Sequence, residues 1–204
     1  MAAESCRSAG PRRRAGRTGE ARDVRQRLKK TVALIGMMGA GKTAVGTALA
    51  RALAVPFLDS DEEIERAASM PVGEIFARDG EAFFRARESE VLTRLMAGAP
   101  AVLSTGGGAF LAAGNRTLIH DKGISIWLKA DLDLLWNRVK HKTTRPLLRT
   151  ANPRETLAGL LAARTPVYAL ADLTVEADPE MTVEDMAQKV IAALVARPDV
   201  LERE

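Results

Sequence analysis

Residues 36–43 read GMMGAGKT, a glycine-rich segment with the spacing Gly-x-x-x-x-Gly-Lys-Thr. A short apolar run, TVALI at 31–35, precedes it, and an alanine-rich stretch of helical character follows. Glycines at these positions allow a tight turn whose backbone N–H groups converge on an anion, and the dipole of the following helix adds positive potential. Lys42 can then reach the β- and γ-phosphates of a nucleotide, while the Thr43 hydroxyl ligates Mg²⁺. A chance glycine turn would match these four fixed positions in roughly one chain in a hundred, so the segment predicts a P-loop.

Two acids, Asp59 and Asp61, follow a second apolar run at 55–58. Side chains two residues apart at the end of a strand point to the same side, so both carboxylates can face one cleft. An ionised carboxylate only accepts hydrogen bonds, which suits a substrate with neighbouring hydroxyl groups. The alternative is structural, because the segment SDEE at 60–63 also fits a capping box with acids in the first helical turn.

Two arginines could hold a substrate carboxylate, since the planar donors of a guanidinium pair with a carboxylate in a bidentate way. For Arg85 the structural alternative is a helix-surface ion pair with Glu81 or Glu88, at i−4 and i+3. For Arg164 the alternative is a cation at a helix C-terminus, just before Pro166. The residues alone leave both alternatives open.

Three consecutive glycines, 106–108, follow a third apolar run at 101–104 and permit close backbone approach to a ligand. An ordinary flexible turn is the alternative. Residues 141–152, HKTTRPLLRTAN, have neither helical nor strand periodicity and carry several basic side chains, among them Arg145. We expect this segment to be a mobile basic loop.

Short apolar runs alternate with helical stretches from Thr31 onward. This alternation predicts an α/β fold with a five-stranded parallel sheet covered on both faces, whose ligands gather at the carboxyl ends of the strands. The glycine-rich segment at 36–43, the acids at 59–61 and the three glycines at 106–108 follow the first three runs, which places them at one edge of the sheet. The expected strands are 31–35, 55–58, 101–104, 125–128 and 173–175, and the expected helices are 42–53, 61–68, 72–77, 81–96, 132–139, 153–164 and 183–196.

The net charge of +4 conceals two different parts of the chain. Residues 1–30 hold ten basic and three acidic side chains, a net charge of +7, and the remainder holds 20 basic and 23 acidic ones, a net charge of −3. The first part is rich in Arg, Ala and Gly and is expected to be a disordered tail. A transit peptide or a weak contact with nucleic acid are functional alternatives for the tail.

The length of 204 residues and a hydrophobic content of 47% fit one folded domain, expected over 31–197, between the tail and a short C-terminal end at 198–204. No apolar run is long enough to span a membrane. Because Cys6 is the single cysteine, no intrachain disulfide is possible, which fits a reducing compartment. We therefore expect a cytoplasmic protein without a membrane partner.

Taken together, these motifs resemble those of the shikimate kinase family over about residues 32–194. One departure is Ala44, where many family members have a hydroxyl residue, and it should cost little if Thr43 serves the metal. Six motifs occur in the order and spacing of the family, and together they are specific for it. They are GMMGAGKTAVG at 36–46, FLDSD at 57–61, DGEAFFR at 79–85, STGGGA at 104–109, TRPLL at 144–148 and RTPVY at 164–168.

The resemblance implies a three-layer α/β/α P-loop kinase with a mobile lid at about 141–152, which phosphorylates the 3-hydroxyl of shikimate with ATP and Mg²⁺. It implies catalytic roles for Lys42, Asp61 and Arg145, and metal support from Thr43 and Asp59. It also implies a monomer that binds no nucleic acid. The ATP-binding residues that it implies are Gly39, Ala40, Gly41, Lys42, Thr43, Ala44, Arg138 and Arg145, and the shikimate-binding residues are Asp61, Arg85, Gly106, Gly107 and Arg164.

Two rival functions stay open on the sequence. One is a kinase for another small hydroxylated acid, such as gluconate, against which the pair of arginines argues. The other is a nucleotide-binding regulatory module that holds nucleic acid through its basic tail, and it would show salt-sensitive binding that is lost on deletion of residues 1–30. A lid-like loop and a separate group of acceptor-binding residues favour an enzyme.

Overall fold

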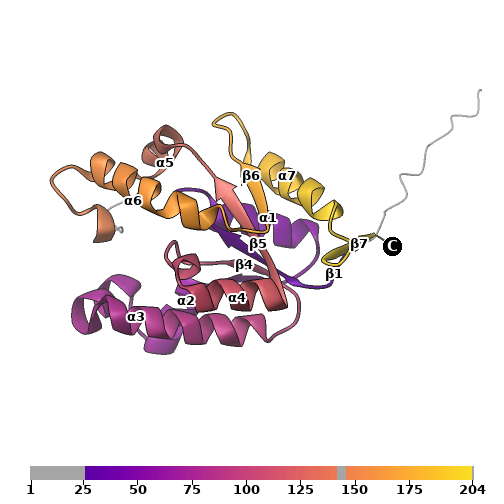
Figure 1. Cartoon of the computed structure of the whole chain (residues 1–204), viewed down its shortest axis with the longest axis horizontal. Helices are drawn as coiled ribbons and strands as arrows, with labels where there is room; N and C mark the ends of the chain where they lie inside the picture. Colours follow the sequence, from indigo (N-terminus) through magenta and orange to yellow (C-terminus); the bar gives the residue numbers. More distant parts are fainter. Residues whose placement is uncertain (1–25, 142–145, 204) are drawn as a thin grey trace, which may run out of the picture.

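A five-stranded parallel sheet forms the centre of the molecule (Figure 1), in the order β3-β4-β2-β5-β6. The computed structural model describes residues 26–141 and 146–203. The strands begin and end close to where the apolar runs predict, which confirms the expected α/β architecture. They are β2 (Thr31–Ile35), β3 (Phe57–Asp59), β4 (Val102–Ser104), β5 (Gly123–Lys129) and β6 (Leu173–Glu176).

Helices cover both faces of the sheet. The connection from β2 to β3 runs toward one edge, whereas those from β3 to β4, β4 to β5 and β5 to β6 run toward the other. Because such crossovers are right-handed, α1 lies on one face, beside α7, and the helices between β3 and β6 lie on the opposite face. The helices are α1 (Lys42–Ala52), α2 (Ser60–Ala68), α3 (Val72–Met96), α4 (Ala113–Lys122), α5 (Leu132–Val139), α6 (Pro153–Tyr168) and α7 (Val183–Val195), with short 3₁₀ turns η1 (Ala109–Leu111) and η2 (Pro146–Leu148).

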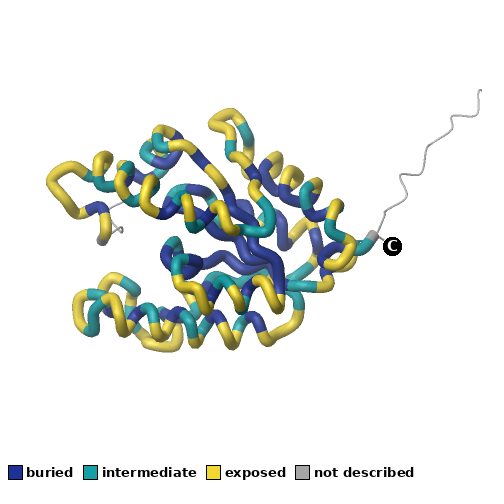
Figure 2. The backbone as a smooth tube through the Cα atoms, in the orientation of Figure 1, coloured by how far each residue is buried: buried dark blue, intermediate teal, exposed yellow. Residues whose placement is uncertain are grey.

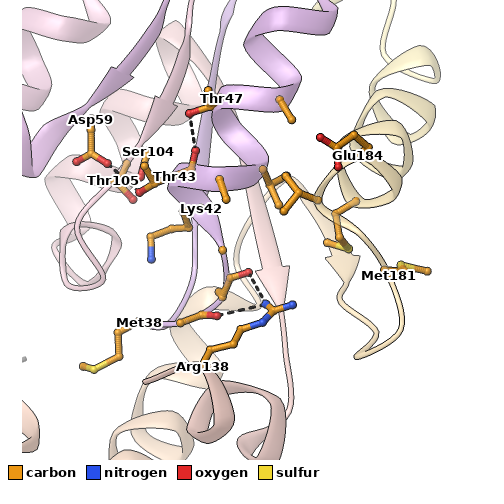
Figure 3. Close-up of a pocket in the computed structure, with 18 of the residues that line it drawn as sticks. Met38, Lys42, Thr43, Thr47, Asp59, Ser104, Thr105, Arg138, Met181 and Glu184 are labelled. Atoms are coloured by element: carbon orange, nitrogen blue, oxygen red, sulfur yellow. Dashed lines mark hydrogen bonds between the residues drawn. The ribbon is translucent and has the colours of Figure 1, made fainter. Parts of the chain in front are cut away.

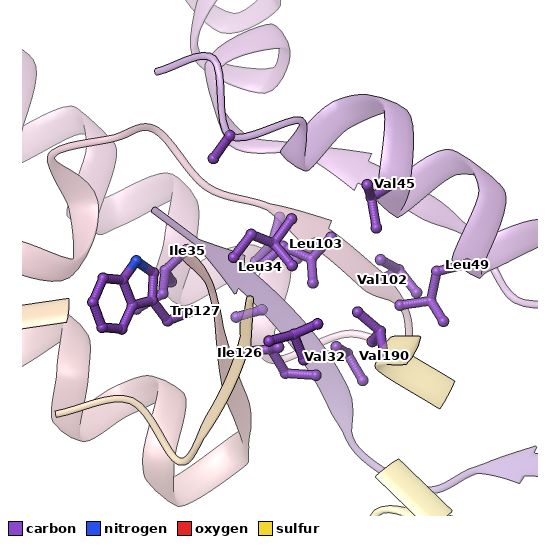
Figure 4. Packing of buried hydrophobic residues seen from close by; sticks show 14 of the residues in the cluster. Val32, Leu34, Ile35, Val45, Leu49, Val102, Leu103, Ile126, Trp127 and Val190 are labelled. Atoms are coloured by element: carbon purple, nitrogen blue, oxygen red, sulfur yellow. The ribbon is translucent and has the colours of Figure 1, made fainter. Parts of the chain in front are cut away.

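The main core lies between the sheet and these helices, and Figure 2 shows the strands as its most buried part. All five residues of β2 are buried, and so are the first six of β5. Side chains on both faces of these strands meet helices, which explains why the runs are continuously apolar instead of alternating. In Figure 4, Val32 and Leu34 of β2 pack with Leu49 of α1 and Val190 of α7.

A second, smaller hydrophobic cluster holds α2 against α3. Ile64, Ile75 and Phe84 form its buried centre, and the rings of Phe76 and Phe84 stack with centroids 4.5 Å apart. Between these rings in the sequence, α3 is interrupted at Gly80, whose φ of 82° and ψ of 171° are not helical. The two helices expected at 72–77 and 81–96 therefore describe this backbone well.

The chain termini differ from the expectation. Strand β1 (Gln26–Leu28) pairs antiparallel with β7 (Leu201–Arg203), so the expected domain limits at 31 and 197 exclude residues that the structure shows as strands. Only two residues separate β1 from β2, which places this ribbon at the amino end of β2, away from the P-loop (Figure 1). Three-residue strands whose partners lie more than 170 residues apart leave no local signal. The rest of the expected tail, residues 1–25, lies outside the described residues.

Two helices also differ from the expected pattern. Helix α4 was not expected at all, since its sequence AGNRTLIHDK has a mixed composition. Helix α6 continues four residues beyond the expected end at Arg164 and passes through Pro166. Tertiary packing overrides the proline here, because Tyr168 in the last turn is fully buried. None of the helices in the described part of the chain is long and apolar enough to cross a membrane.

Candidate active site

The segment between β2 and α1 forms a tight loop at the carboxyl end of the central strand. It turns on glycines with positive φ, 84° at Gly39 and 96° at Gly41, a region that other residues rarely adopt. Gly41 is the N-cap of α1, so the loop leads directly into the positive end of the helix dipole. Lys42 Nζ donates to the carbonyl oxygens of Gly36 at 2.9 Å and Met37 at 3.1 Å, which draws the ammonium group back over the loop.

Asp59 connects this loop to the next strand. Its Oδ2 accepts a hydrogen bond of 3.1 Å from the Thr43 hydroxyl, and its Oδ1 accepts one of 3.0 Å from the backbone N–H of Asp61. Asp59 is therefore the N-cap of α2, so the capping interpretation is right about the helix start but not about Ser60 as the cap. The buried hydroxyl oxygen of Ser60 instead accepts a hydrogen bond from the Gly106 N–H at 3.0 Å.

Thr43 and Asp59 are also the oxygen donors that a hard divalent cation prefers. No group of three or more His, Cys, Asp or Glu side chains that could hold a metal occurs among the described residues. This donor set fits Mg²⁺ in a nucleotide complex, because that ion takes most of its ligands from phosphates and water and only one or two from the protein.

A cavity of about 840 Å³ opens over the P-loop. Arg138 of α5 lines it, and its Nη1 donates to the carbonyl oxygens of Gly39 and Ala40, both at 3.3 Å (Figure 3). The expected nucleotide-side residues Gly39–Ala44 and Arg138 all line this cavity, as do Asp59, Asp61 and Gly107. The opposite wall is formed by residues 181–184 and Met186, shown in part in Figure 3.

The residues of this opposite wall were not among the site residues expected from the sequence. A signal was present, because Thr182 and Asp185 form a capping box at the start of α7. A helix start that follows the last strand of a parallel sheet must lie near the ligand-binding edge.

On the acceptor side, Arg85 of α3 is surrounded by acids and aromatic rings. Its Nη1 donates to Glu88 Oε2 at 2.8 Å, while Nε and Nη2 donate to Glu81 Oε1 at 3.3 and 3.1 Å. The guanidinium carbon lies 5.2 Å from the centre of the Phe84 ring. The ion pairs with Glu81 and Glu88, which the sequence offered as an alternative to substrate binding, are therefore both present. The guanidinium also lies over Gly108, where a Cβ atom would collide with it.

Glu88 and Asp61 converge above Gly106. A Cβ built on Gly106 would lie 2.6 Å from Glu88 Oε1 and 2.7 Å from Asp61 Oδ1, so only glycine fits there. Glu88 is 1% exposed, and its Oε1 has no hydrogen-bond partner among the described residues. Burial raises the pKa of Glu88, an effect that the charge of Arg85 partly offsets and that of Asp61 reinforces.

Arg164 reaches the same glycine loop from the other side. It is 8% exposed, and its Nη1 lies 3.4 Å from the carbonyl oxygen of Gly107, to which the Tyr168 hydroxyl also donates. Because α6 continues to Tyr168, Arg164 lies inside the helix, and its interpretation as a cation at a helix C-terminus is wrong.

A P-loop with a second group of polar side chains beside it narrows the possible functions to those of small-molecule kinases. Comparison with known proteins decides which kinase family the chain belongs to. The family model for shikimate kinase matches residues 38–195. This chain belongs to the shikimate kinase family. Shikimate kinase of Cereibacter sphaeroides is 68% identical over 190 residues, which cover 93% of this chain and 95% of that protein. Shikimate kinase of Ruegeria pomeroyi is 66% identical over 86% of this chain and 90% of its own length.

Solved structures agree with this membership of the shikimate kinase family. The structure of shikimate kinase from Acinetobacter baumannii in complex with shikimate superimposes with a TM-score of 0.79 at 40% identity, over 82% of this chain and 93% of that one. The family, the fold and the enzyme class expected from the sequence are thereby confirmed. Kinases that use ATP generally require a divalent metal ion, so the family implies such a cofactor.

The fold brings most of the expected site residues together, from β3, from helices α1, α2, α3 and α6, and from the loop after β4. Lys42, Thr43, Asp59 and Asp61 share the cavity, and Arg85, Gly106, Gly107 and Arg164 lie around the glycine loop beside it. Arg145, the expected lid arginine, lies outside the described residues. The individual roles of all these residues stay predictions.

Proposed function

We propose that this chain transfers the γ-phosphoryl group of MgATP to the 3-hydroxyl of shikimate, giving shikimate 3-phosphate for the synthesis of chorismate and the aromatic amino acids. The observation that carries the proposal is the position of Asp61, Arg85 and Arg164 around the glycine loop beside the P-loop cavity, in a chain of the shikimate kinase family. Phosphoryl transfer depends on such positioning and on charge neutralisation more than on covalent help.

The nucleotide side would hold the phosphates with backbone N–H groups of residues 39–44 and the ammonium of Lys42. Lys42 now donates to two loop carbonyls, and a bound phosphate would compete for it with a full negative charge. Arg138 keeps the loop in shape by donating to two of its carbonyl groups and would lie beside the nucleotide. Thr43 and Asp59 would hold Mg²⁺, which supplies neutralisation of charge on the transferring phosphates.

The acceptor side would fix the carboxylate of shikimate between Arg85 and Arg164. Asp61 would accept the proton of the 3-hydroxyl as that oxygen forms its bond to the γ-phosphorus and the bridging P–O bond breaks, leaving the electron pair on ADP. Gly106 and Gly107 would let the ring approach the backbone closely. Arg145 would close over the transferring group from the lid and exclude water.

The test is ATP consumption by the purified chain with shikimate, gluconate and nucleoside monophosphates in parallel. We expect ADP formation that depends on shikimate, with the other two at background. The absence of shikimate-dependent turnover would contradict the proposal, and turnover with gluconate instead would assign the acceptor site to another hydroxy acid. A monomer in the cytoplasm remains our expectation, and light scattering on the eluting protein tests the oligomeric state.

A further inference from the structure

Tyr168 is the only tyrosine of the chain, and it is fully buried beneath the acceptor side of the site. Its hydroxyl donates to the carbonyl oxygen of Gly107 and lies 3.8 Å from Met37 Sδ. Its ring packs against Trp127, with centroids 6.0 Å apart. One phenol group therefore contacts both the glycine loop after β4 and the P-loop after β2.

These two loops also contact each other directly. A Cβ built on Gly107 would lie 3.6 Å from the Gly36 carbonyl oxygen and 3.8 Å from the Met38 nitrogen, both in the P-loop. A shift of Gly107 would thus change the distance between the acceptor and the phosphates. The orientation of its peptide group depends on the donors that its carbonyl receives.

Both of those donors come from α6. Arg164 and Tyr168 are four residues apart and therefore lie on the same face of the helix. The bond from Arg164 is long, 3.4 Å, and the shorter contact is made by the tyrosine hydroxyl. Without the hydroxyl, Arg164 would be the one donor left to this carbonyl among the described residues. The carbonyl would then draw the guanidinium toward Gly107 and away from a substrate carboxylate.

We propose that Tyr168 is a positioning residue for the acceptor: its hydroxyl fixes the Gly107 peptide group and leaves the Arg164 guanidinium available to the substrate. This inference rests on the proposed function, in which Gly107 and Arg164 bind shikimate. Burial raises the pKa of Tyr168, and the neighbouring charge of Arg164 offsets this only in part. The phenol thus stays protonated, as a donor must, at neutral pH.

The variant Tyr168→Phe keeps the ring and its packing and removes only the hydroxyl. We expect KM for shikimate to rise about tenfold, as for the loss of one buried hydrogen bond in the bound state, while KM for ATP changes less than about twofold. If KM and kcat for shikimate in this variant equalled those of the wild type, the proposal would be overturned.

Ser125→Ala is the matched control, because it removes another buried hydroxyl outside the site. Ser125 is 3% exposed on β5, and its Oγ donates to Asp172 Oδ2 at 2.6 Å. We expect this variant to lower the melting temperature while KM for shikimate stays at the wild-type value. A similar rise of KM in both variants would mean that general loosening explains the effect, and it would overturn the proposal.

A spectroscopic readout separates positioning from packing. Incorporation of 3-fluorotyrosine places one fluorine label in the chain, because the sequence contains a single tyrosine. We expect its single ¹⁹F resonance to shift when shikimate is added without nucleotide, and a resonance that ignores saturating shikimate would contradict the proposal. If the wild-type enzyme fails to turn over shikimate, the proposed function fails; if it turns over and Tyr168→Phe equals it, only this inference fails.

Discussion

The nucleotide side and the acceptor side of the site are built in different ways. The nucleotide side consists largely of one continuous segment, residues 36–44, whose backbone N–H groups we expect to do most of the phosphate binding. The acceptor side takes Asp61 from α2, Arg85 from α3, Gly106 and Gly107 from the loop after β4, and Arg164 from α6. In the proposed function, the first side could serve any nucleotide-dependent enzyme, whereas the second would determine which hydroxyl group is phosphorylated.

The Arg85 part of the acceptor side rests on a different part of the hydrophobic interior from the P-loop. The P-loop is anchored between β2 and α1, which belong to the main core. Arg85 follows directly on Phe84 of the small cluster between α2 and α3, and that helix is interrupted at Gly80. A small cluster stabilises its surroundings less than a large core, so we expect the part of the acceptor side around Arg85 to adjust more easily on binding.

The largest effect should come from Lys42→Ala on the nucleotide side. Loss of the Lys42 ammonium, which we expect to hold the phosphates, should lower kcat by on the order of a hundred- to a thousandfold. The melting temperature should change by only a few degrees, since Lys42 is half-buried and contributes little to the core. Steady-state kinetics and thermal unfolding measure both quantities. A variant with more than a tenth of the wild-type kcat would remove Lys42 from its proposed role.

A smaller and more selective effect should come from Arg85→Ala on the acceptor side. Removal of a charge-assisted pair to the substrate should raise KM for shikimate roughly ten- to a hundredfold and leave KM for ATP nearly unchanged. Arg85→Lys, which keeps a positive charge beside Glu88 but not the planar fork, should fall between. Unaltered kinetics with shikimate would contradict the substrate assignment.

Glu81→Gln is the control for Arg85, because it removes the exposed partner alone. The Glu81 side chain is 64% exposed, and exposed pairs at i,i+4 are worth only a few tenths of a kcal/mol, about a twofold change at most. A large change of KM in this variant would show that Glu81, and not the substrate, determines the position of Arg85.

The smallest effect is on how stability depends on pH, and it contrasts Glu88 on the acceptor side with Asp172, which lies outside the site. The raised pKa of Glu88 means that its contribution to stability is complete below the unfolded pKa and is lost as pH rises through the folded pKa. At Asp172, burial alone would raise the pKa, but hydrogen bonds from Ser125 and His120 outweigh burial and lower it. That contribution is present above the unfolded pKa and is lost as pH falls through the folded pKa.

Denaturant unfolding of Glu88→Gln and Asp172→Asn between acid and neutral pH measures both contributions. As pH rises, the wild type should lose stability relative to Glu88→Gln and gain it relative to Asp172→Asn. A gain of stability relative to both variants as pH rises would instead show that Glu88 ionises more easily in the folded protein than in the unfolded chain.

Much of the fold was open to prediction because it depends on local patterns. Buried parallel strands are continuously apolar, so all five strands of the sheet could be placed, and β2 and α5 were predicted to the residue. The features that were missed depend on distant partners. β1 and β7 are strands only because they meet each other, and α6 passes Pro166 only because Tyr168 packs under the site.

The sequence by itself determined the P-loop, the enzyme family and the residues that could bind the acceptor. It could do so because a phosphate-binding loop consists of consecutive residues whose conformation is set by glycines and by the helix that follows. Only the tertiary structure decided that Glu88 is buried against Asp61 over Gly106, and that Tyr168 supports Gly107 from α6. Such contacts join residues that lie up to 61 positions apart, and no local periodicity records which distant elements will meet.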